Sequence, residues 1–211
     1  DFDHNFSNVT VTMDYFDIEI TDYIGRFSAQ EILDNCYVAG DAAECAKINR
    51  ISGSLGTSGA GINRFTTNLD FLRTEGVDLT VSTDYDLGEY GSLDLSLYGS
   101  YLLTQESQSS SAVAVIDCLG VYGTQCNPTP ELTFNQRTSW NKGPWGASVL
   151  WRYIGAMDIE DVQRGSTFDG FESIDAHSYF DVTGTYTLND NWGLTMQVRN
   201  LLDKEPPIIG N

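Results

Sequence analysis

The strictest pattern in this sequence is an alternation of apolar and polar residues with a period of two, and it runs through residues 72–105. Before the segment GEYG at 88–91, apolar side chains take most odd positions from Val77 to Leu87. After it they take the odd positions from Leu93 to Leu103. Such alternation predicts two β-strands, each with an apolar and a water-facing side, joined by a tight turn. One whole face of this hairpin must therefore lie against something apolar.

The same alternation predicts about seven strands that are joined in a regular way. The expected strands cover, in chain order, residues 8–20, 63–87, 92–105, 131–140, 145–155, 177–188 and 192–202. Tight turns are expected at 88–91, 141–144 and 189–191. They alternate with long loops at 21–62, 106–130 and 157–176. This is the layout of an all-β, antiparallel, up-and-down transmembrane β-barrel with short periplasmic turns and long extracellular loops.

The aromatic residues favour a membrane barrel over a soluble β fold. One set lies beside the tight turns and would anchor the strands at one membrane interface: Tyr85, Trp140, Trp145, Tyr186 and Trp192. A second set, Tyr101, Tyr153 and Phe180, follows about eight residues further along the strands, which is roughly 20 Å. Two aromatic girdles around an apolar band are typical of membrane proteins. The alternative is a soluble, secreted β-rich module that binds a glycan or a protein.

Composition and motifs argue against a nucleic-acid partner, a transmembrane helix and enzyme activity. The 211 residues include 30 acidic and 11 basic side chains, a formal net charge of −19, which argues against nucleic acid as a partner. No apolar run is long enough to predict a transmembrane helix. The chain has two histidines and no GxSxG motif, so nothing supports a hydrolytic triad and we expect no enzyme activity.

The four cysteines fall into two local pairs, Cys36 with Cys45 and Cys118 with Cys126. Neither pair has the CxxC spacing of a zinc site, and both histidines lie far from them in the sequence. We expect each pair to form a disulfide that closes a loop in an oxidising compartment. Each bridge would contribute roughly 2.5 kcal/mol in the chain-entropy model.

Two of the long loops carry further signals. Ser28 followed by Glu31 is a capping box, which predicts a short helix over 29–35. The loop at 158–175 is acidic, with carboxylates that include Asp158, Asp169 and Asp175. Calcium bound by this loop is one hypothesis, because calcium takes six to eight oxygen ligands. A solvated extracellular surface is the other, because the loop lacks the DxDxDG register.

The polar face of the predicted strands would line the lumen of such a barrel. Its charged residues and one tyrosine are candidates for contact with a substrate or with a domain inside the barrel: Asp78, Asp94, Tyr98, Arg137, Arg152 and Arg199. Their simplest role is to solvate the lumen or to pack against that domain.

Five segments, in a fixed order, resemble the C-terminal part of a TonB-dependent outer-membrane receptor. They are VTMDYFDIEITDYI, TEGVDLTVSTDYDL, TSW, LWRYIG and SYFDVTGTYTLNDNWGLTMQVRNLLDKEPP. The last is the most specific, since in this family it resembles the hairpin that precedes the terminal strand. The likeness covers nearly the whole chain.

The resemblance implies that residues 1–211 are the C-terminal portion of a barrel of about 22 strands. Such a barrel lies in the outer membrane of a Gram-negative cell, in contact with lipid, and holds an N-terminal plug with a TonB box on which the TonB complex acts. The plug, the box and the terminal strand are absent here, so we expect the sequence to be part of a longer chain. The implied function is TonB-dependent uptake of a scarce solute, which could be an oligosaccharide, a siderophore or a cobalamin-like molecule.

Overall fold

The computed structural model describes residues 6–110, 113–165, 167 and 170–208. The chain divides into two compact units. Unit 1 contains Asp1–Asp17, Glu75–Thr104 and Cys118–Asn211, and unit 2 contains Ile18–Thr74 and Gln105–Asp117. Three long strands contribute residues to both units: β1 (Phe6–Thr21), β6 (Phe71–Asp86) and β7 (Ser92–Gln108).

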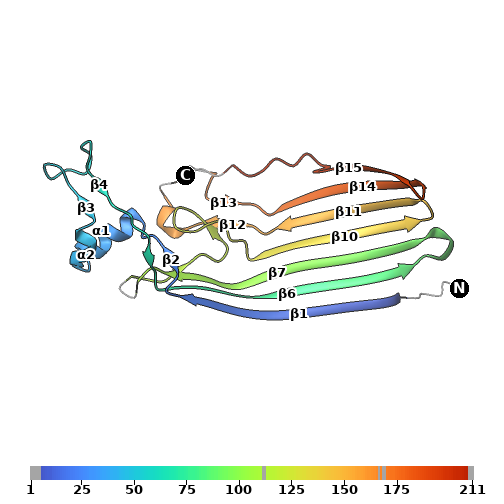
Figure 1. Cartoon of the computed structure of the whole chain (residues 1–211), viewed down its shortest axis with the longest axis horizontal. Helices are drawn as coiled ribbons and strands as arrows, with labels where there is room; N and C mark the ends of the chain where they lie inside the picture. Colours follow the sequence, from blue (N-terminus) through green and yellow to red (C-terminus); the bar gives the residue numbers. More distant parts are fainter. Residues whose placement is uncertain (1–5, 111–112, 166, 168–169, 209–211) are drawn as a thin grey trace. The chain divides into compact units, whose positions relative to one another are not determined.

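Unit 1 is built on an antiparallel sheet whose long strands run up and down (Figure 1). The order across the sheet is β1–β6–β7–β10–β11–β14–β15, so each long strand pairs with the next long strand of the chain. The remaining long strands are β10 (Leu132–Lys142), β11 (Trp145–Ile154), β14 (His177–Asn189) and β15 (Trp192–Val198). The predicted up-and-down, all-β architecture is confirmed.

The register of the strands gives this sheet two chemically different faces. One row across it joins the apolar or small residues Leu93, Trp140, Ala147, Gly184 and Met196. The adjacent row joins the polar residues Asp94, Ser139, Ser148, Thr183 and Gln197. Because successive residues of a strand point to opposite sides, the first row belongs to an apolar face and the second to a polar face.

The turn between β6 and β7 is as tight as the alternation predicts. The 3-10 helix η1 (Gly88–Tyr90) fills it, and Leu87 N–H donates to Gly91 O across its base. Gly91 has a φ of 99°, and a Cβ there would lie 2.1 Å from Asn141 O. Only glycine fits at this position, so the turn and the start of β7 depend on it.

The last strand is shorter than predicted. The alternation suggests a strand over 192–202, but β15 ends at Val198. Asn200 takes a left-handed φ of 49°, and its backbone N–H donates to Asp181 Oδ1 at 2.8 Å. The backbone N–H of Asn200 therefore donates to the Asp181 side chain of β14, and it does not extend the backbone pairing of β15 with β14.

The strand expected over 63–87 also begins later, at Phe71. The residues before it belong to unit 2, where β5 (Thr67–Asn68) pairs with β2 (Ile24–Gly25) and Leu69 is buried. Leu69 is buried with other apolar residues in the core of unit 2. This burial stabilises a conformation in which the residues before Phe71 do not extend β6.

Two of the long loops fold onto each other in unit 1. Their strands β9 (Val121–Tyr122), β12 (Met157–Ile159) and β13 (Ser173–Ile174) form a small sheet in the order β13–β12–β9, and the 3-10 helix η2 (Asp161–Gln163) follows β12. The side chains of Tyr122, Met157, Ile159 and Ile174 make a buried cluster. A loop layer with its own core was not predicted, because its apolar residues show no long alternation.

Unit 2 holds the helices. α1 (Ala29–Tyr37) and α2 (Ala42–Cys45) are accompanied by the pairs β2–β5 and β3–β4, where β3 is Ile48–Asn49 and β4 is Gly61–Ile62. The strand β8 (Ile116–Asp117) pairs with the end of β7. Phe27, Ile32 and Leu69 form the core of the unit.

Within the described residues, no helix has the length and apolar character needed to cross a membrane.

Candidate functional site

The apolar face of the unit 1 sheet carries large exposed side chains. Val11, Leu194 and Met196 are each more than half exposed. A groove of about 620 Å³ on this face is lined by Leu97, Trp151 and other apolar residues of β1, β6, β7, β10 and β11. An apolar surface that continues over neighbouring strands is unfavourable in water and suits lipid hydrocarbon.

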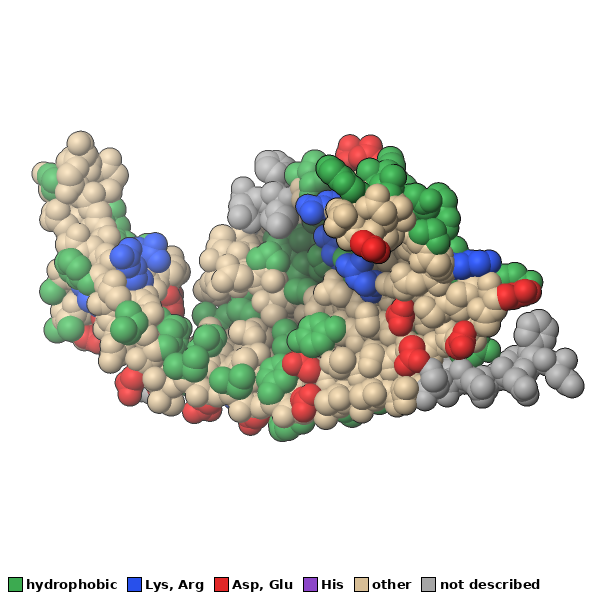
Figure 2. Space-filling view, turned by 45° about the vertical axis from the view of Figure 1, so that its right-hand side comes forward, with side chains coloured by type: hydrophobic (Ala, Val, Ile, Leu, Met, Phe, Trp, Pro, Cys, Tyr) green, Lys and Arg blue, Asp and Glu red, His purple; other side chains and the backbone are tan. Residues whose placement is uncertain are grey.

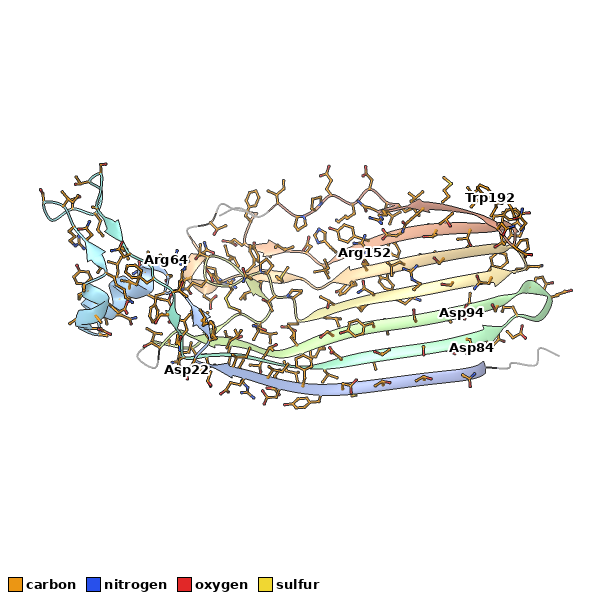
Figure 3. The ribbon with its side chains drawn as sticks, in the orientation of Figure 1. Asp22, Arg64, Asp84, Asp94, Arg152 and Trp192 are labelled. Atoms are coloured by element: carbon orange, nitrogen blue, oxygen red, sulfur yellow. A yellow bond between two sulfur atoms is a disulfide. The ribbon has the colours of Figure 1, made fainter. Side chains whose placement is uncertain are left out.

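The predicted interface anchors lie on this apolar face beside the tight turns. The rings of Trp145 and Tyr186 are 4.3 Å apart, and both line a recess with Trp140 and Met196. Trp140 Nε1 donates to Tyr90 O at 2.8 Å, and Trp192 is 71% exposed at the start of β15 (Figure 3). A ring with a polar edge suits a membrane interface, and the anchoring role itself stays a prediction.

Four residues form a row across the polar face, each on a different strand. Tyr98 of β7 pairs with Asn135 of β10, Asn135 pairs with Arg152 of β11, and Arg152 pairs with Tyr179 of β14. Neighbouring strands are about 4.8 Å apart, so this transverse row spans roughly 14 Å from one tyrosine to the other. It places two phenol rings, an amide and a guanidinium along one line.

Arg152 is held from one side by β14. Its Nη2 donates to Asp181 Oδ1 at 3.1 Å, and its guanidinium carbon lies 5.4 Å from the centre of the Tyr179 ring. Asp181 in turn accepts the backbone N–H of Asn200 and is 7% exposed. The Nε of Arg152 is buried and has no hydrogen-bond partner among the described residues. The Arg152 side chain is 41% exposed, so a further oxygen ligand could accept a hydrogen bond from its Nη groups but could not reach the buried Nε.

The acidic and basic residues of the polar face come from different strands. Arg137 of β10 lies in the row next to Arg152, where its Nη1 donates to Ser148 Oγ, and no carboxylate of the described residues is within ion-pair distance of it. Asp84 of β6 and Asp94 of β7 instead line a recess of about 260 Å³. Figure 2 shows Lys and Arg side chains gathered in the hollow of this surface, and Figure 3 shows Arg152 on a different strand from Asp84 and Asp94.

The structure brings together three of the predicted lumen residues. Tyr98 and Arg152 share the transverse row and Arg137 lies in the adjacent one. Asp94 lies nearer the turns and accepts from Asn141 Nδ2 at 3.1 Å, while Asp78 has a buried Oδ1 without a hydrogen-bond partner in the described part of the chain. Their contact with a substrate stays a prediction.

Sequence reasoning missed Asn135, Tyr179 and Asp181 as members of this cluster. Alternation alone places each of them on the polar face. Asn135 and Tyr179 lie in the transverse row and Asp181 lies in the adjacent one. Their positions depend on how β7 pairs with β10 and how β11 pairs with β14, across loops whose length sets no register. Arg199 follows β15, and its charge acts favourably on Asp181.

A disulfide and a carboxylate fix the loop layer of unit 1. Cys118 and Cys126 are bonded, with Cα atoms 5.3 Å apart, as their spacing predicts. Glu160 is buried, and its carboxylate accepts the backbone N–H groups of Thr124, Gln125 and Cys126 together with Thr124 Oγ1. Burial raises the pKa of Tyr122, with the charges of Asp158 and Glu172 adding to it, and its phenol donates to Phe171 O at 2.6 Å.

The capping box predicted in unit 2 is present. Ser28 Oγ accepts from Glu31 N–H, and Glu31 Oε2 accepts from Ser28 N–H at 2.6 Å. Burial opposes ionisation of Glu31, but hydrogen bonds from Ser109 and Ser28 and the charge of Arg64 leave the pKa of this carboxyl below its ordinary value of 4.5. The second predicted disulfide, Cys36–Cys45, joins α1 to α2.

The acidic loop at 158–175 has its own intramolecular partners. Glu160 faces the backbone of 124–126, and Asp158 and Asp161 both lie within ion-pair distance of Arg164. Asp169 lies outside the described residues. No group of three or more potential metal ligands is gathered among the residues that the structure describes. Calcium binding by this loop stays a prediction.

Comparison with known proteins gives one match. A family model described as "TonB dependent receptor-like, beta-barrel" matches residues 1–201, which is nearly the whole chain. No curated protein and no solved structure matches the sequence.

Proposed function

The chain belongs to the TonB-dependent receptor β-barrel family, and from this premise we propose that it forms part of the wall of an outer-membrane transporter that takes up a scarce solute. The family is one of outer-membrane receptors with a transport role. In the proposed protein, residues 1–211 are a C-terminal portion of the barrel. Its apolar face lies against lipid and its polar face lines the lumen.

The proposed mechanism is gated uptake without covalent chemistry. The folded loops capture the solute at the cell surface, and the polar face offers it a hydrated path. TonB would act through a plug domain inside the barrel. An oligosaccharide, a siderophore and a cobalamin-like molecule are the candidate solutes.

The observation that carries this proposal is the two-faced sheet. Rows of apolar residues such as Leu93, Ala147 and Met196 alternate with rows of polar residues across neighbouring strands. Several of the apolar side chains are exposed. A soluble sheet buries its apolar face against protein, whereas a barrel in a membrane turns that face outward.

Membrane fractionation and detergent dependence test the proposal. We expect the protein in the outer-membrane fraction, with release by detergent only and a folded band on unboiled gels that shifts on boiling. The soluble-module alternative predicts a folded monomer in plain buffer. That result would refute the transporter proposal, whatever ligand the protein binds.

A further inference from the structure

We propose that a recess on the apolar face, beside the tight turns, binds one phospholipid of the periplasmic leaflet. Its walls carry the side chains of Trp140, Trp145, Tyr186 and Met196, and its volume is about 350 Å³. We call it the aromatic recess. One acyl chain fills the recess, and the neighbouring Lys142 binds the phosphate diester. This inference rests on the proposed membrane location and adds a lipid ligand that solute uptake does not itself require.

The recess exists because two small residues lie side by side in a row of large ones. Ala147 of β11 pairs with Gly184 of β14, and the same row continues to Trp140 on one side and to Met196 on the other. A Cβ built on Gly184 would meet no atom within 4 Å, so the space above this part of β14 is open. The recess is therefore a gap between large side chains, with the surface of the sheet as its floor.

A hollow with such walls has to be filled by hydrocarbon when it faces the membrane. Water in it would find few hydrogen-bond partners, because aromatic and aliphatic side chains form most of the lining. An empty hollow would leave these side chains without contacts on one side and forfeit dispersion energy. Lipid chains elsewhere in the bilayer already have apolar surroundings, so the recess selects a chain by shape. A polar contact is then needed to hold one particular class of lipid.

Lys142 and two aromatic residues supply the polar contacts in one row. Lys142 pairs with Trp145 across the β10–β11 turn, and Trp145 pairs with Tyr186, so all three side chains leave the sheet on the apolar face. Lys142 Nζ lies 5.6 Å from the centre of the Tyr90 ring, and no carboxylate of the described residues is within ion-pair distance of it. The Trp145 N–H and the Tyr186 hydroxyl have no hydrogen-bond partner in the described part of the chain. An ammonium, an indole N–H and a phenol at the membrane interface are suitable donors for phosphate and glycerol oxygens.

The charges near Lys142 determine what kind of headgroup fits. Lys142 is the one basic residue of the three tight turns. The carboxylates at this end of the sheet are Asp84, Asp86, Glu89, Asp94 and Asp190. Asp84 and Asp94 line the recess of the polar face, on the other side of the sheet. Glu89 and Asp190 are exposed in the neighbouring turns. These carboxylates repel a headgroup with several negative charges, whereas a single phosphate diester needs only one cation in direct contact.

Native mass spectrometry of the intact outer-membrane protein, purified in a mild detergent, tests the site with two lipids that share their acyl chains. Dioleoylphosphatidylglycerol carries one phosphate diester, and dioleoylglycerol carries none. We expect phosphatidylglycerol to bind about fivefold more tightly, which is the contribution of one Lys to the attraction of an anionic lipid. This preference should decrease as the concentration of ammonium acetate rises, because salt screens the contact.

Two variants locate the lipid. Lys142→Gln, in an exposed turn, should weaken binding of phosphatidylglycerol about fivefold and leave binding of dioleoylglycerol unchanged. Gly184→Leu places a side chain in the open space of the recess and should weaken binding of both lipids severalfold. The matched controls are Arg164→Gln, a charge change in the loop layer, and Val81→Leu, an enlarged aliphatic residue on β6. Both controls should bind the two lipids as the wild type does.

Three outcomes overturn the proposal. Equal affinity of the wild type for the two lipids would show that the phosphate is not bound. Unchanged binding of phosphatidylglycerol in Lys142→Gln and Gly184→Leu proteins that give the wild-type folded band would place the lipid elsewhere. A dimer of the wild type that Gly184→Leu abolishes would show that a second copy of the chain fills the recess. Each outcome leaves the transport proposal standing, because that proposal is decided by membrane fractionation.

Discussion

At the scale of single residues, Glu160 has the largest set of hydrogen bonds in the loop layer. Its carboxylate accepts three backbone N–H groups and a hydroxyl from Thr124, Gln125 and Cys126. Glu160→Gln puts an amide NH2 group among these donors and removes the charge. We expect local opening to become easier by about 2 kcal/mol, since charge-assisted hydrogen bonds are worth about 1.5–3 kcal/mol.

Amide hydrogen exchange measures this decrease in the free energy of local opening. The N–H groups of Thr124, Gln125 and Cys126 should exchange roughly thirtyfold faster in the variant. Glu172→Gln, in the same layer but exposed, is the control and should leave the rates of these amides unchanged. Equal rates in Glu160→Gln and the wild type would contradict the prediction.

Glu31 makes unit 2 sensitive to acid. Its folded-state pKa is below the ordinary value of 4.5, so ionised Glu31 contributes stability that is fully present above about pH 4.5. That contribution disappears as the pH falls from 4.5 through the lower folded-state value. Glu31→Gln should remove this part of the pH dependence. Thermal unfolding of unit 2 followed between pH 3 and pH 7 tests it, with Asp34→Asn, an exposed carboxylate of the same helix, as the control.

These two glutamates also show that a side-chain hydrogen bond can be predicted from sequence when its partner is local, and not when its partner is distant in the chain. The capping box of Glu31 could be predicted, because its partner Ser28 is three positions away and the geometry of a helix start is fixed. The partners of Glu160 lie 34–36 residues earlier in the chain. No local pattern connects them, since the contact exists only after two loops have folded together.

At the scale of elements, glycines in the long strands differ in whether the structure has room for an added side chain. A Cβ on Gly76 of β6 would lie 2.7 Å from both Phe16 Cζ and Tyr101 O, a backbone atom that cannot move aside cheaply. Gly76→Ala should therefore destabilise the sheet by about 1–3 kcal/mol, the usual cost of overpacking. A Cβ on Gly184 of β14 would meet nothing within 4 Å, so Gly184→Ala should be neutral or slightly stabilising.

Urea unfolding of the protein in lipid vesicles separates the two variants. The midpoint should fall for Gly76→Ala and stay the same or rise for Gly184→Ala. Equal midpoints would show that the close approach between β1, β6 and β7 is not a constraint on the sheet.

Strands and tight turns could be predicted from sequence, because alternation and turn chemistry are local signals. The predicted faces of the Leu93 and Trp140 strands are confirmed by their pairing. The ends of strands were less predictable, as β15 shows, where Asp181 of the neighbouring strand captures the Asn200 N–H. The transverse row could not be predicted, because two of its three pairings, β7 with β10 and β11 with β14, join strands across long loops.

At the scale of the whole molecule, the membrane assignment predicts an asymmetry between adjacent residues. Leu97 and Ser96 are neighbours on β7, with Leu97 in the apolar groove and Ser96 in the polar recess. An arginine facing lipid near the bilayer midplane costs about 2–4 kcal/mol, whereas an arginine in the lumen meets water. Leu97→Arg should therefore lower stability by that amount, and Ser96→Arg should have little effect.

Folding into vesicles of defined lipid provides the measurement, with the folded band on unboiled gels as the readout. Similar folding yields for the two arginine variants would mean that neither face lies in lipid. In a soluble β-sandwich Leu97→Arg would also be destabilising, because Leu97 would then occupy a packed core, so the requirement of the wild-type protein for lipid or detergent separates the two folds.

The locality of the two disulfides also affects how such a protein is made. Each bridge joins cysteines only nine or eight positions apart, and each lies within one unit. Short rings close quickly, so each correct bond can form on a chain that is still crossing the periplasm. Isomerase repair of mispaired thiols should then be dispensable during biogenesis, while the oxidant that introduces the bonds should be required.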